Sequence, residues 1–298
     1  AAIGGGVTST DVNGTTAGLG WSTATWKLGA TKSGSYITFG VYSKNATKVM
    51  LELYDNYSGQ NALASVFMEK GTDSIWRAKI SISAATALAD AVYYGYRCWG
   101  PNWTYSTSWA RGNSSAGFIS DCDSAGNRFN PNKVLFDPYA REISHDKSNP
   151  TVLGTQNAGM FGTGADLYNG VARRNFDTGK WAPKAVVIAD TTGYGTKPNI
   201  AQKDAIIYEA HVRGLTKHPS TASLTTILGG MSDFSAVTNV PSNLQGTYAG
   251  AALMAPYLKA LGVNTIELLP VHETDNDANP DSAPGGNFWG YMTYGYFA

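Results

Sequence analysis

Apolar and polar residues alternate along short segments in the first third of the chain. The segments 36–43 and 48–55 alternate large apolar side chains with small or polar ones, and SVFMEK, SIWRAKIS and AVYYGYRCW follow them. Stretches rich in Gly, Ser, Asp and Asn separate these segments. Because a period of two places one face of each strand inside, the pattern predicts an antiparallel β-sandwich.

The chain becomes irregular between about residues 100 and 198, where Asn, Gly and Pro are frequent. Pieces such as NRFNPNKVLFDPYAREI do not follow a helical or a strand period. A long segment of this kind in a compact protein is usually functional or spans a domain junction. We therefore expect loops that pack against a larger body.

A different pattern begins near Lys203. Segment 204–215 starts with a continuous apolar run, which predicts a strand buried on both faces, and segment 263–271 predicts a second one. Between them, segment 249–262 has a helical period and ends at Gly262, a suitable C-terminal cap. The residues expected on its apolar face are Leu253, Tyr257, Leu258 and Leu261. Strand, helix and parallel strand form one βαβ unit, which implies a parallel sheet or a barrel.

The amino-acid composition indicates the environment in which these elements fold. Charged residues are only 15% of the 298, against about 25% in an average soluble protein. Ser, Thr, Asn and 34 glycines supply the polarity, which favours a secreted, extracellular protein. The amino end has no signal peptide and suits a mature secreted chain. The net charge is zero and no run of Lys or Arg occurs, so nucleic acid and membrane partners are not expected.

Two cysteines occur, Cys98 and Cys122. An even number in a secreted chain permits one disulfide, which would stabilise the fold by about 3 kcal/mol. The alternative is two separate, buried thiols, and the sequence leaves both open. The spacing does not fit a zinc site.

Five segments carry a resemblance to a known family. They are AVYYGYRCWGPNW, GFISDCDSAGNRFNPNKVLFDPYARE, GTKPNIAQKDAIIYEAHVRGLT, YLKALGVNTIELLPVHETDNDAN and NFWGYMTYGYFA. In this order they resemble bacterial isoamylases, which are debranching enzymes of the α-amylase superfamily (glycoside hydrolase family 13). The resemblance runs from about residue 35 to the last residue.

The resemblance implies a multi-domain fold, in which an N-terminal antiparallel β-sandwich is followed by a (β/α)₈ TIM barrel. A complete barrel needs about 250 residues, so only its truncated start is expected here. We assign residues 1–155 to a β-sandwich domain of the carbohydrate-binding type. Residues 156–298 are assigned to a linker region and the first part of the catalytic barrel.

The resemblance also implies the chemistry, which is hydrolysis of α-1,6-glucosidic linkages in starch, amylopectin and glycogen. Retaining hydrolysis uses two carboxyl groups about 5–5.5 Å apart. In the family these groups follow barrel strands 4, 5 and 7, so we assign no catalytic residue in this chain. Glu209 and Glu267 lie within predicted strands and are interpreted as structural. The remaining C-terminal part of the enzyme is an expected partner, either absent here or a separate, nicked polypeptide.

A calcium site is implied by the stretch LLPVHETDNDANPD, residues 268–281. Glu273, Thr274 and Asn276 match the calcium segment of the family, and Asp146 matches its partner from an earlier part of the chain. Calcium prefers such carboxylate, carbonyl and amide oxygens. The alternative is a solvated acidic loop. We expect weak binding in this chain, because the family's last ligand follows its final residue.

Aromatic residues near the carboxyl end suggest where a sugar binds. Tyr291 matches the family tyrosine that stacks on the sugar beside the scissile bond, and an aromatic face suits the apolar face of a pyranose. Trp289 is either a second contact or a core residue. Trp99 and Trp103 are interpreted as buried corner residues rather than a glucan platform.

Two other functions remain open. One is a pullulanase-type or glycogen-debranching sister enzyme with the same layout. The other is a non-catalytic, glucan-binding β-sandwich protein, against which the βαβ unit argues. Phosphate-binding loops and nucleophile elbows do not appear in the sequence.

Overall fold

The computed structural model describes residues 27–33, 36–81, 93–189, 193, 195–276 and 287–298. Its contacts divide the chain into two compact units. Unit 1 comprises residues 1–190, 272–286 and 292–298, and unit 2 comprises residues 191–271 and 287–291. Residues 156–190 therefore pack with unit 1, whereas the ranges 1–155 and 156–298 stay a prediction about the domains of the family.

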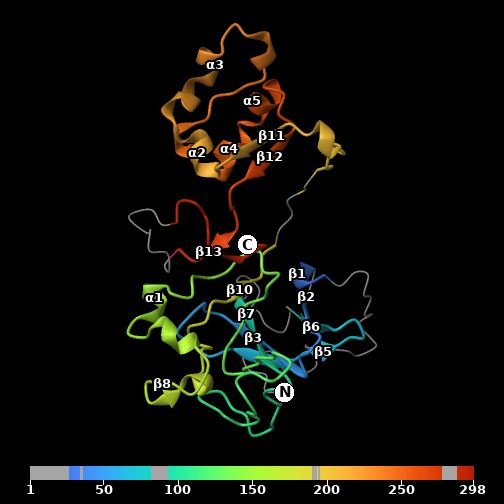
Figure 1. Ribbon diagram of the computed structural model, residues 1–298, viewed down its shortest axis with the longest axis vertical. Coiled ribbons are helices and arrows are strands. Elements are labelled where there is room, and N and C mark those ends of the chain that lie inside the picture. Colours follow the sequence, from blue (N-terminus) through green and yellow to red (C-terminus); the bar gives the residue numbers. More distant parts are fainter. Residues whose placement is uncertain (1–26, 34–35, 82–92, 190–192, 194, 277–286) are drawn as a thin grey trace. The chain divides into compact units, whose positions relative to one another are not determined.

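Unit 1 is built on two four-stranded antiparallel sheets (Figure 1). The first has the order β1 (Gly29–Ser33), β2 (Tyr36–Tyr42), β6 (Ile75–Ser81), β5 (Glu69–Lys70). The second has the order β10 (Ala185–Val186), β7 (Tyr93–Trp99), β3 (Lys48–Tyr54), β4 (Ala64–Phe67). Two antiparallel sheets are the elements that the alternating pattern predicts.

One hydrophobic core joins the two sheets. Ile37, Phe39 and Val41 of β2 belong to the same buried cluster as Leu51 and Leu53 of β3. Every second residue along these parts of the two strands therefore points inward, which is the period of two that the sequence contains. The prediction of a sandwich for this part of the chain is confirmed as two antiparallel sheets that share a core.

The irregular segment after β7 covers the second sheet and has a small core of its own. Its short elements are α1 (Pro150–Leu153), η3 (Ala158–Phe161), β8 (Leu167–Tyr168), β9 (Val171–Ala172) and η4 (Arg173–Asn175). Leu153, Met160, Tyr168 and Phe176 form the core of this segment. The expectation of loops packed against a larger body is therefore confirmed.

Trp99 and Trp103 are buried, with exposed fractions of 0% and 1%. The Trp103 indole donates a hydrogen bond to the Ala116 carbonyl oxygen over 2.9 Å, and its ring meets Phe118 edge to face. Their interpretation as buried corner residues is confirmed, because neither ring offers a face to a glucan.

Unit 2 contains the predicted βαβ unit. β11 (Ile207–Ala210) pairs in parallel with β12 (Thr265–Leu268). The helical elements between them are α2 (Val212–Lys217), η6 (Pro219–Ser223), α3 (Leu224–Ile227), η7 (Ser232–Phe234), η8 (Ser242–Leu244), α4 (Tyr248–Ala252) and α5 (Ala255–Ala260). η5 (Gln202–Asp204) precedes β11.

The prediction that both strands are buried on both faces is wrong for this chain. Ile207 is 57% exposed and Leu268 is 45% exposed. The reason is that β11 and β12 form a two-stranded sheet among the described residues, so no further strand covers them. The apolar run does predict a strand, but the burial of that strand depends on its neighbours.

The predicted helix over 249–262 is two short helices, α4 and α5. The break falls at Leu253 and Met254, just before Pro256 at the start of α5. Proline has no N–H to donate to the preceding turn, so it favours a new helix start. Leu258 is buried at 2% exposure, whereas Leu261 is 48% exposed, so Leu261 does not lie on the buried face.

Gly262 caps α5 as predicted. Its φ is +87°, and its N–H donates to the Lys259 carbonyl oxygen over 2.9 Å. The Val263 N–H donates to the Leu258 carbonyl oxygen over 3.0 Å. This pair of bonds is a Schellman motif, which needs a residue in the left-handed region and therefore favours glycine.

The possible disulfide is not formed. Cys98 is a partly buried free thiol and Cys122 is an exposed one. The structure supports separate thiols, but the expectation that both are buried is wrong for Cys122.

The helices in the part of the chain that the structure describes are too short or too polar to span a membrane.

Candidate functional site

The predicted metal ligands Glu273 and Thr274 form a short strand, β13 (Glu273–Thr274), in unit 1. It pairs antiparallel with β14 (Thr293–Gly295), with an irregular register between Glu273 and Thr274. The Glu273 N–H also donates to the Ala298 carbonyl oxygen over 2.9 Å. At Gly295 an added Cβ would lie 2.7 Å from the Ile143 side chain, so only glycine allows this close packing.

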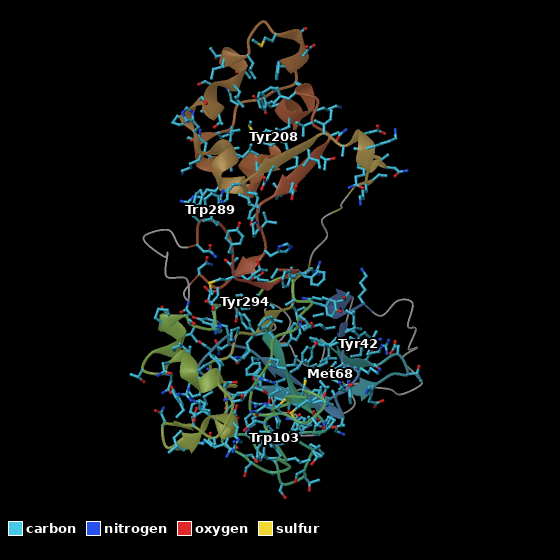
Figure 2. The ribbon with its side chains drawn as sticks, in the orientation of Figure 1. Tyr42, Met68, Trp103, Tyr208, Trp289 and Tyr294 are labelled. Carbon is cyan, nitrogen blue, oxygen red and sulfur yellow. The ribbon has the colours of Figure 1, made fainter. Side chains whose placement is uncertain are left out.

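Asp146 meets this hairpin from a distant part of the chain. The Asn276 backbone N–H donates to Asp146 Oδ2 over 2.9 Å. The Tyr294 hydroxyl of β14 donates to the His145 carbonyl oxygen over 2.8 Å and contacts Asp146 Oδ1 at 3.3 Å. Figure 2 shows Tyr294 among the strands at this end of unit 1. Asp146 is therefore held in place by main-chain and side-chain donors.

Thr274 and Asn276 complete the set within one tight turn. The Thr274 hydroxyl donates to Asn276 Oδ1 over 3.1 Å, and Asn276 Nδ2 contacts the Thr274 carbonyl oxygen at 3.3 Å. Thr274 is 7% exposed, whereas the Asn276 side chain is exposed. The structure thus brings the oxygen-bearing groups of all four predicted ligands into one region.

The electrostatics of this region favour a cation. Burial raises the pKa of Glu273, and the negative charges of Asp146 and Glu142 raise it further. Burial also raises the pKa of Tyr294, as do the charges of Asp146 and Glu273. Carboxylates that repel one another in a partly buried place are stabilised by a bound cation.

These four residues fit calcium by their chemistry, since all of their donors are hard oxygens. Among the described residues, no group of three or more His, Cys, Asp or Glu side chains is arranged to hold a metal, so carbonyl and amide oxygens would have to contribute. Both ring nitrogens of His145 already have partners, namely the Ser144 hydroxyl at 2.8 Å and the Trp181 carbonyl at 3.0 Å.

Asp275 lies in the same turn and was not predicted as a ligand. It is 4% exposed, and its Oδ2 is 3.8 Å from the Lys147 ammonium. The sequence gives no signal that Asp275 is buried, because it is a single acidic residue between two predicted ligands. Asp277 and Asp281 of the same stretch lie outside the described residues.

The predicted sugar-binding aromatics belong to unit 2. Tyr291 is 56% exposed and Trp289 is 52% exposed, so neither is a core residue. Figure 2 shows Trp289 at the edge of this unit. The Phe288 ring stacks on His211 with centroids 4.3 Å apart, and Trp289 meets both rings edge to face.

His211 fixes this aromatic loop to the first strand of unit 2. Its Nδ1 accepts the Gly214 N–H over 3.0 Å and caps α2, while its Nε2 lies 2.5 Å from the Phe288 carbonyl oxygen. Asn287 Nδ2 bonds the Tyr291 carbonyl oxygen. At Gly290 an added Cβ would lie 2.5 Å from the Pro270 carbonyl oxygen. The exposed rings are therefore carried on a tightly bonded loop.

Glu209 and Glu267 face each other in the register of β11 and β12. Both side chains are exposed. Their role as structural residues stays a prediction.

The second sheet carries a buried ion network that the sequence pattern does not predict. Glu52 is 0% exposed. It forms an ion pair with Arg97 at 2.9 Å and accepts hydrogen bonds from Arg111 Nε and from the Tyr54 hydroxyl, both over 2.6 Å. Arg97 also pairs with Asp177 at 2.9 Å. Burial alone would raise the pKa of Glu52, but the two guanidinium groups outweigh it and lower the pKa.

This network explains why the covering segment stays on the sheet. Arg111 and Asp177 belong to that segment, whereas Glu52 and Arg97 belong to β3 and β7. The alternating pattern predicts Glu52 as a surface residue, because it lies on the face opposite the core. The pattern does not reveal that loops cover this face.

Comparisons with known proteins relate the chain to the isoamylases. Residues 27–140 match the family described as carbohydrate-binding module 48 (isoamylase N-terminal domain). The isoamylase of Pseudomonas amyloderamosa is 44% identical over 88% of this chain and 31% of its own length. The isoamylase of a Flavobacterium species is 45% identical over 88% of this chain and 31% of its own length.

A glycogen debranching enzyme of Yersinia enterocolitica is 28% identical over 91% of this chain and 33% of its own length. The chain spans about a third of the length of these curated relatives. The resemblance seen in the sequence is thus confirmed: over the part of their length that it spans, the chain is similar to the isoamylases.

Proposed function

We propose that this chain is part of an isoamylase-type enzyme that hydrolyses α-1,6 branch linkages of amylopectin and glycogen. The observation that carries the proposal is the 44% identity to an isoamylase over 88% of the chain. The identity to a glycogen debranching enzyme is lower, at 28%, which favours the isoamylase over that sister enzyme.

In this proposal the βαβ unit supplies the first two strands of a (β/α)₈ barrel. The parallel pairing of β11 with β12 supports it, because a parallel pair joined through helices is the repeating unit of that fold. The exposure of Ile207 and Leu268 supports it too, since the apolar side chains of such strands are normally covered by neighbours.

Hydrolysis itself would use residues beyond these strands. A retaining mechanism needs one carboxylate as nucleophile and one carboxyl group as acid and base. By resemblance these groups follow later barrel strands, so we assign none of them to this chain. What this chain contributes is binding and support.

Calcium is proposed as a structural cofactor of the enzyme. Asp146, Glu273, Thr274 and Asn276 would hold it through carboxylate, carbonyl and amide oxygens. When bound, the ion would neutralise the repelling carboxylates and tie the residue 146 loop to the β13 turn. The mixed set of hard oxygens and the raised pKa of Glu273 support this assignment.

Tyr291 and Trp289 are proposed to contact the glucan. Their exposed rings and the bonded loop that carries them support this role, because a rigid aromatic face can stack on a pyranose at little entropic cost. We also propose that the enzyme is secreted, on the basis of its 15% charged residues.

The test is a debranching assay with amylopectin. The enzyme that contains this chain is expected to release linear α-1,4 chains, seen as new reducing ends and stronger iodine staining. The 298-residue chain alone is expected to release none. Hydrolysis by the isolated chain would contradict the missing carboxylates, and tight glucan binding without hydrolysis by the longer enzyme would favour a non-catalytic glucan-binding protein.

A further inference from the structure

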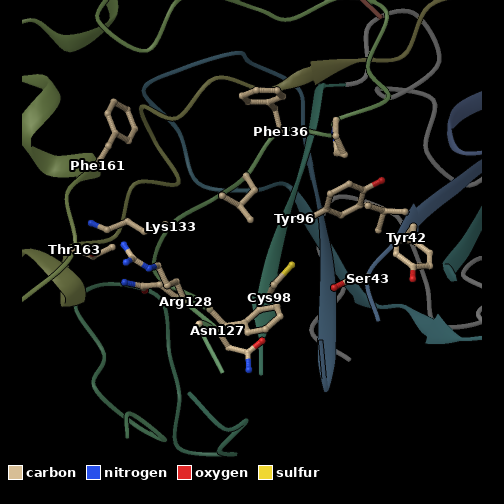
Figure 3. Close-up of a pocket in the computed structure, with 16 residues that line it drawn as sticks. Tyr42, Ser43, Tyr96, Cys98, Asn127, Arg128, Lys133, Phe136, Phe161 and Thr163 are labelled. Atoms are coloured by element: carbon tan, nitrogen blue, oxygen red, sulfur yellow. The ribbon is translucent and has the colours of Figure 1, made fainter. Parts of the chain in front are cut away.

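Residues 287–291 of unit 2, the aromatic loop, lie outside the part of the chain that matches the carbohydrate-binding module 48 family. The cavity of about 570 Å³ in unit 1 lies inside that part (Figure 3). All of its wall except Phe161 and Thr163 comes from residues 27–140, which are the matched residues. The cavity therefore belongs to the module that the family match describes, whereas the aromatic loop does not.

The aromatic loop lies at the carboxyl ends of both parallel strands of unit 2. His211 directly follows β11, and its Nε2 lies 2.5 Å from the Phe288 carbonyl oxygen. Close to the end of β12, the Pro270 carbonyl oxygen would lie 2.5 Å from a Cβ added at Gly290. Parallel α/β folds bind their ligands at the carboxyl ends of the strands. Two strand ends therefore set the place of the loop, and His211 supplies the hydrogen bond.

The His211 imidazole fixes residue 288 by its face and by its edge. The Phe288 ring stacks on the imidazole with centroids 4.3 Å apart and planes 7° from parallel, while Nε2 meets the carbonyl oxygen of the same residue. Trp289 then meets both rings edge to face, with centroids 5.8 Å from His211 and 5.1 Å from Phe288. One side chain thus holds both the main chain and the ring of residue 288.

Asn287 fixes the shape of the same loop from within. Its Oδ1 accepts the Gly290 N–H over 3.0 Å, and its Nδ2 donates to the Tyr291 carbonyl oxygen. Gly290 has a φ of +71°, which favours glycine and holds the chain in one tight turn. Because the loop has a fixed shape, a shift at Phe288 also shifts Tyr291.

The partners of His211 select one form of the imidazole. Nδ1 accepts the Gly214 N–H over 3.0 Å, so it carries no proton. Nε2 faces a carbonyl oxygen, which only accepts, so it carries the proton. The neutral Nε2–H tautomer is the one form that satisfies both bonds. In this form a single ring caps α2 and holds the aromatic loop.

We propose that His211 is a positioning residue for glucan binding. Its Nε2–H bond and its stacked ring hold Phe288, and through the fixed loop they orient the Tyr291 ring toward the sugar. The proposal rests on the proposed role of Tyr291 as a sugar contact. It assigns to His211 an effect on catalysis that passes through the loop and not through contact with the substrate.

Two amide variants separate the cap from the loop bond. The oxygen of His211→Asn takes the place of Nδ1 and caps α2, but the side chain is too short to reach the Phe288 carbonyl. The longer side chain of His211→Gln reaches that carbonyl with its N–H and loses the cap. In the enzyme that contains this chain, His211→Gln is expected to keep kcat/KM for amylopectin within about threefold, and His211→Asn to lower it about tenfold.

Thermal unfolding is expected to rank the two variants the other way, with His211→Asn the more stable because asparagine is a favoured helix cap. If His211 were only a structural residue, activity would follow stability. Activity of His211→Asn equal to or above that of His211→Gln would therefore overturn the proposal.

A double-mutant cycle tests whether His211 acts through Tyr291. In a Tyr291→Ala background, His211→Asn is expected to lower kcat/KM by less than about twofold, because the ring that it orients is absent. A further tenfold loss in that background, as for independent sites, would overturn the proposal.

His218 offers a matched control in the same unit. Its Nδ1 also accepts a backbone N–H at the start of a helical element, from Ser220 over 3.2 Å. His218→Ala is expected to leave kcat/KM unchanged. A loss as large as that of His211→Asn would show that any lost cap lowers activity, and it would overturn the specific role of His211.

The tautomer and the loop are measured on the 298-residue chain itself. Long-range ¹H–¹⁵N spectra of the four histidines, with His211 assigned by its loss in His211→Asn, are expected to show a protonated Nε2 and an unprotonated Nδ1. Amide hydrogen exchange of Gly290 is expected to be faster in His211→Asn than in His211→Gln. A protonated Nδ1, or equal exchange in both variants, would contradict the proposal.

Failure of this role and failure of the proposed function are distinguishable. Normal debranching of amylopectin by His211→Asn refutes only the positioning role. An enzyme that does not debranch, but whose Gly290 amide exchanges faster in His211→Asn than in His211→Gln, supports the hold of His211 on the loop and refutes only the hydrolytic function.

Discussion

The backbone N–H of Asn276 donates a hydrogen bond to the Oδ2 atom of Asp146 over 2.9 Å, across 130 residues of sequence. This bond brings an early loop and a late turn together in unit 1. The fold of this unit therefore brings together the oxygen donors of the four proposed calcium ligands in this chain.

The first prediction concerns calcium. Calcium at about ten times its Kd is expected to raise the melting temperature of the 298-residue chain by a few degrees, because it binds the folded state only. Asp146→Asn removes one carboxylate and is expected to abolish this rise. Differential scanning fluorimetry with calcium or a chelator measures both.

The variant Glu273→Gln distinguishes repulsion between neighbouring carboxylates from metal binding. Without calcium this variant is expected to be at least as stable as the parent, since a charge that Asp146 and Glu142 disfavour is removed. With calcium it is expected to gain nothing. Asp166→Asn, an exposed carboxylate of unit 1, is the control and should keep the calcium response. A full response in both site variants would refute the assignment.

The second prediction concerns the buried ion network. Glu52→Gln is expected to lower the free energy of unfolding by about 3–5 kcal/mol, because Arg97 is 1% exposed and loses the more deeply buried of its two counter-charges. Urea unfolding followed by circular dichroism measures this. Glu69→Gln on β5 is the control, with an expected change within about 0.5 kcal/mol. If Glu52→Gln lowers the free energy of unfolding no more than Glu69→Gln does, the network does not stabilise the fold.

The third prediction is a pH dependence at Asp73. Its hydrogen bond from Arg77 lowers the pKa of Asp73 to about 2, below the ordinary 3.8. A folded-state pKa below the unfolded value gives stability that is present above about pH 4 and is lost as the pH falls toward about 2. Asp73→Asn is therefore expected to melt earlier than the parent at about pH 7 and to match it near pH 2.

Melting curves between about pH 2 and pH 7 test this. Asp204→Asn is the control, because the Asp204 and Lys203 side chains of this ion pair are 60% and 83% exposed. That variant is expected to follow the parent at every pH. A constant difference for Asp73→Asn down to about pH 2 would contradict a role of the carboxylate charge.

The fourth prediction compares two glycines of unit 2. Gly262→Ala is expected to cost about 1 kcal/mol of unfolding free energy, because Gly262 has a φ of +87°. Gly214→Ala within α2 is expected to stabilise by up to about 1 kcal/mol, since the nearest atoms to an added Cβ are those of His211, at 3.6 Å or more. Thermal unfolding of both variants measures the two changes in unfolding free energy. Changes of the same sign would contradict the capping role of Gly262.

The fifth prediction concerns the proposed glucan contact. In the enzyme that contains this chain, Tyr291→Ala is expected to lower kcat/KM for amylopectin at least about tenfold, whereas Tyr291→Phe keeps the ring and most of the activity. Tyr296→Ala removes another exposed tyrosine, 67% exposed, and is expected to have little effect. Full activity of Tyr291→Ala would exclude a stacking role.

The elements of this protein follow closely from local pattern. Alternation along β2 and β3 predicts strands because Phe39 and Leu51 are inside and alternate with residues of the other face. Gly262 ends its helix because of its own backbone freedom. The break at Pro256 has an equally local cause, the missing N–H, although the helical period hides it.

Burial on the second face of a strand does not follow from the sequence. Glu52 and Arg97 alternate with core residues as surface positions do, and only the folded loops that carry Arg111 and Asp177 enclose them. For Ile207 the prediction errs in the opposite direction. Its apolar run predicts a buried side chain, but the side chain is 57% exposed because no neighbour in this structure covers it.

The sequence by itself determined the strands, the βαβ order, the helix cap and the family resemblance, since each depends on residues close together or on short matching segments. The tertiary structure decided which distant groups meet, such as Asp146 with Asn276 and Glu52 with Arg111. It also decided that the two cysteines remain apart as free thiols. Such meetings depend on the path of the whole chain, which a local pattern of apolar and polar residues does not contain.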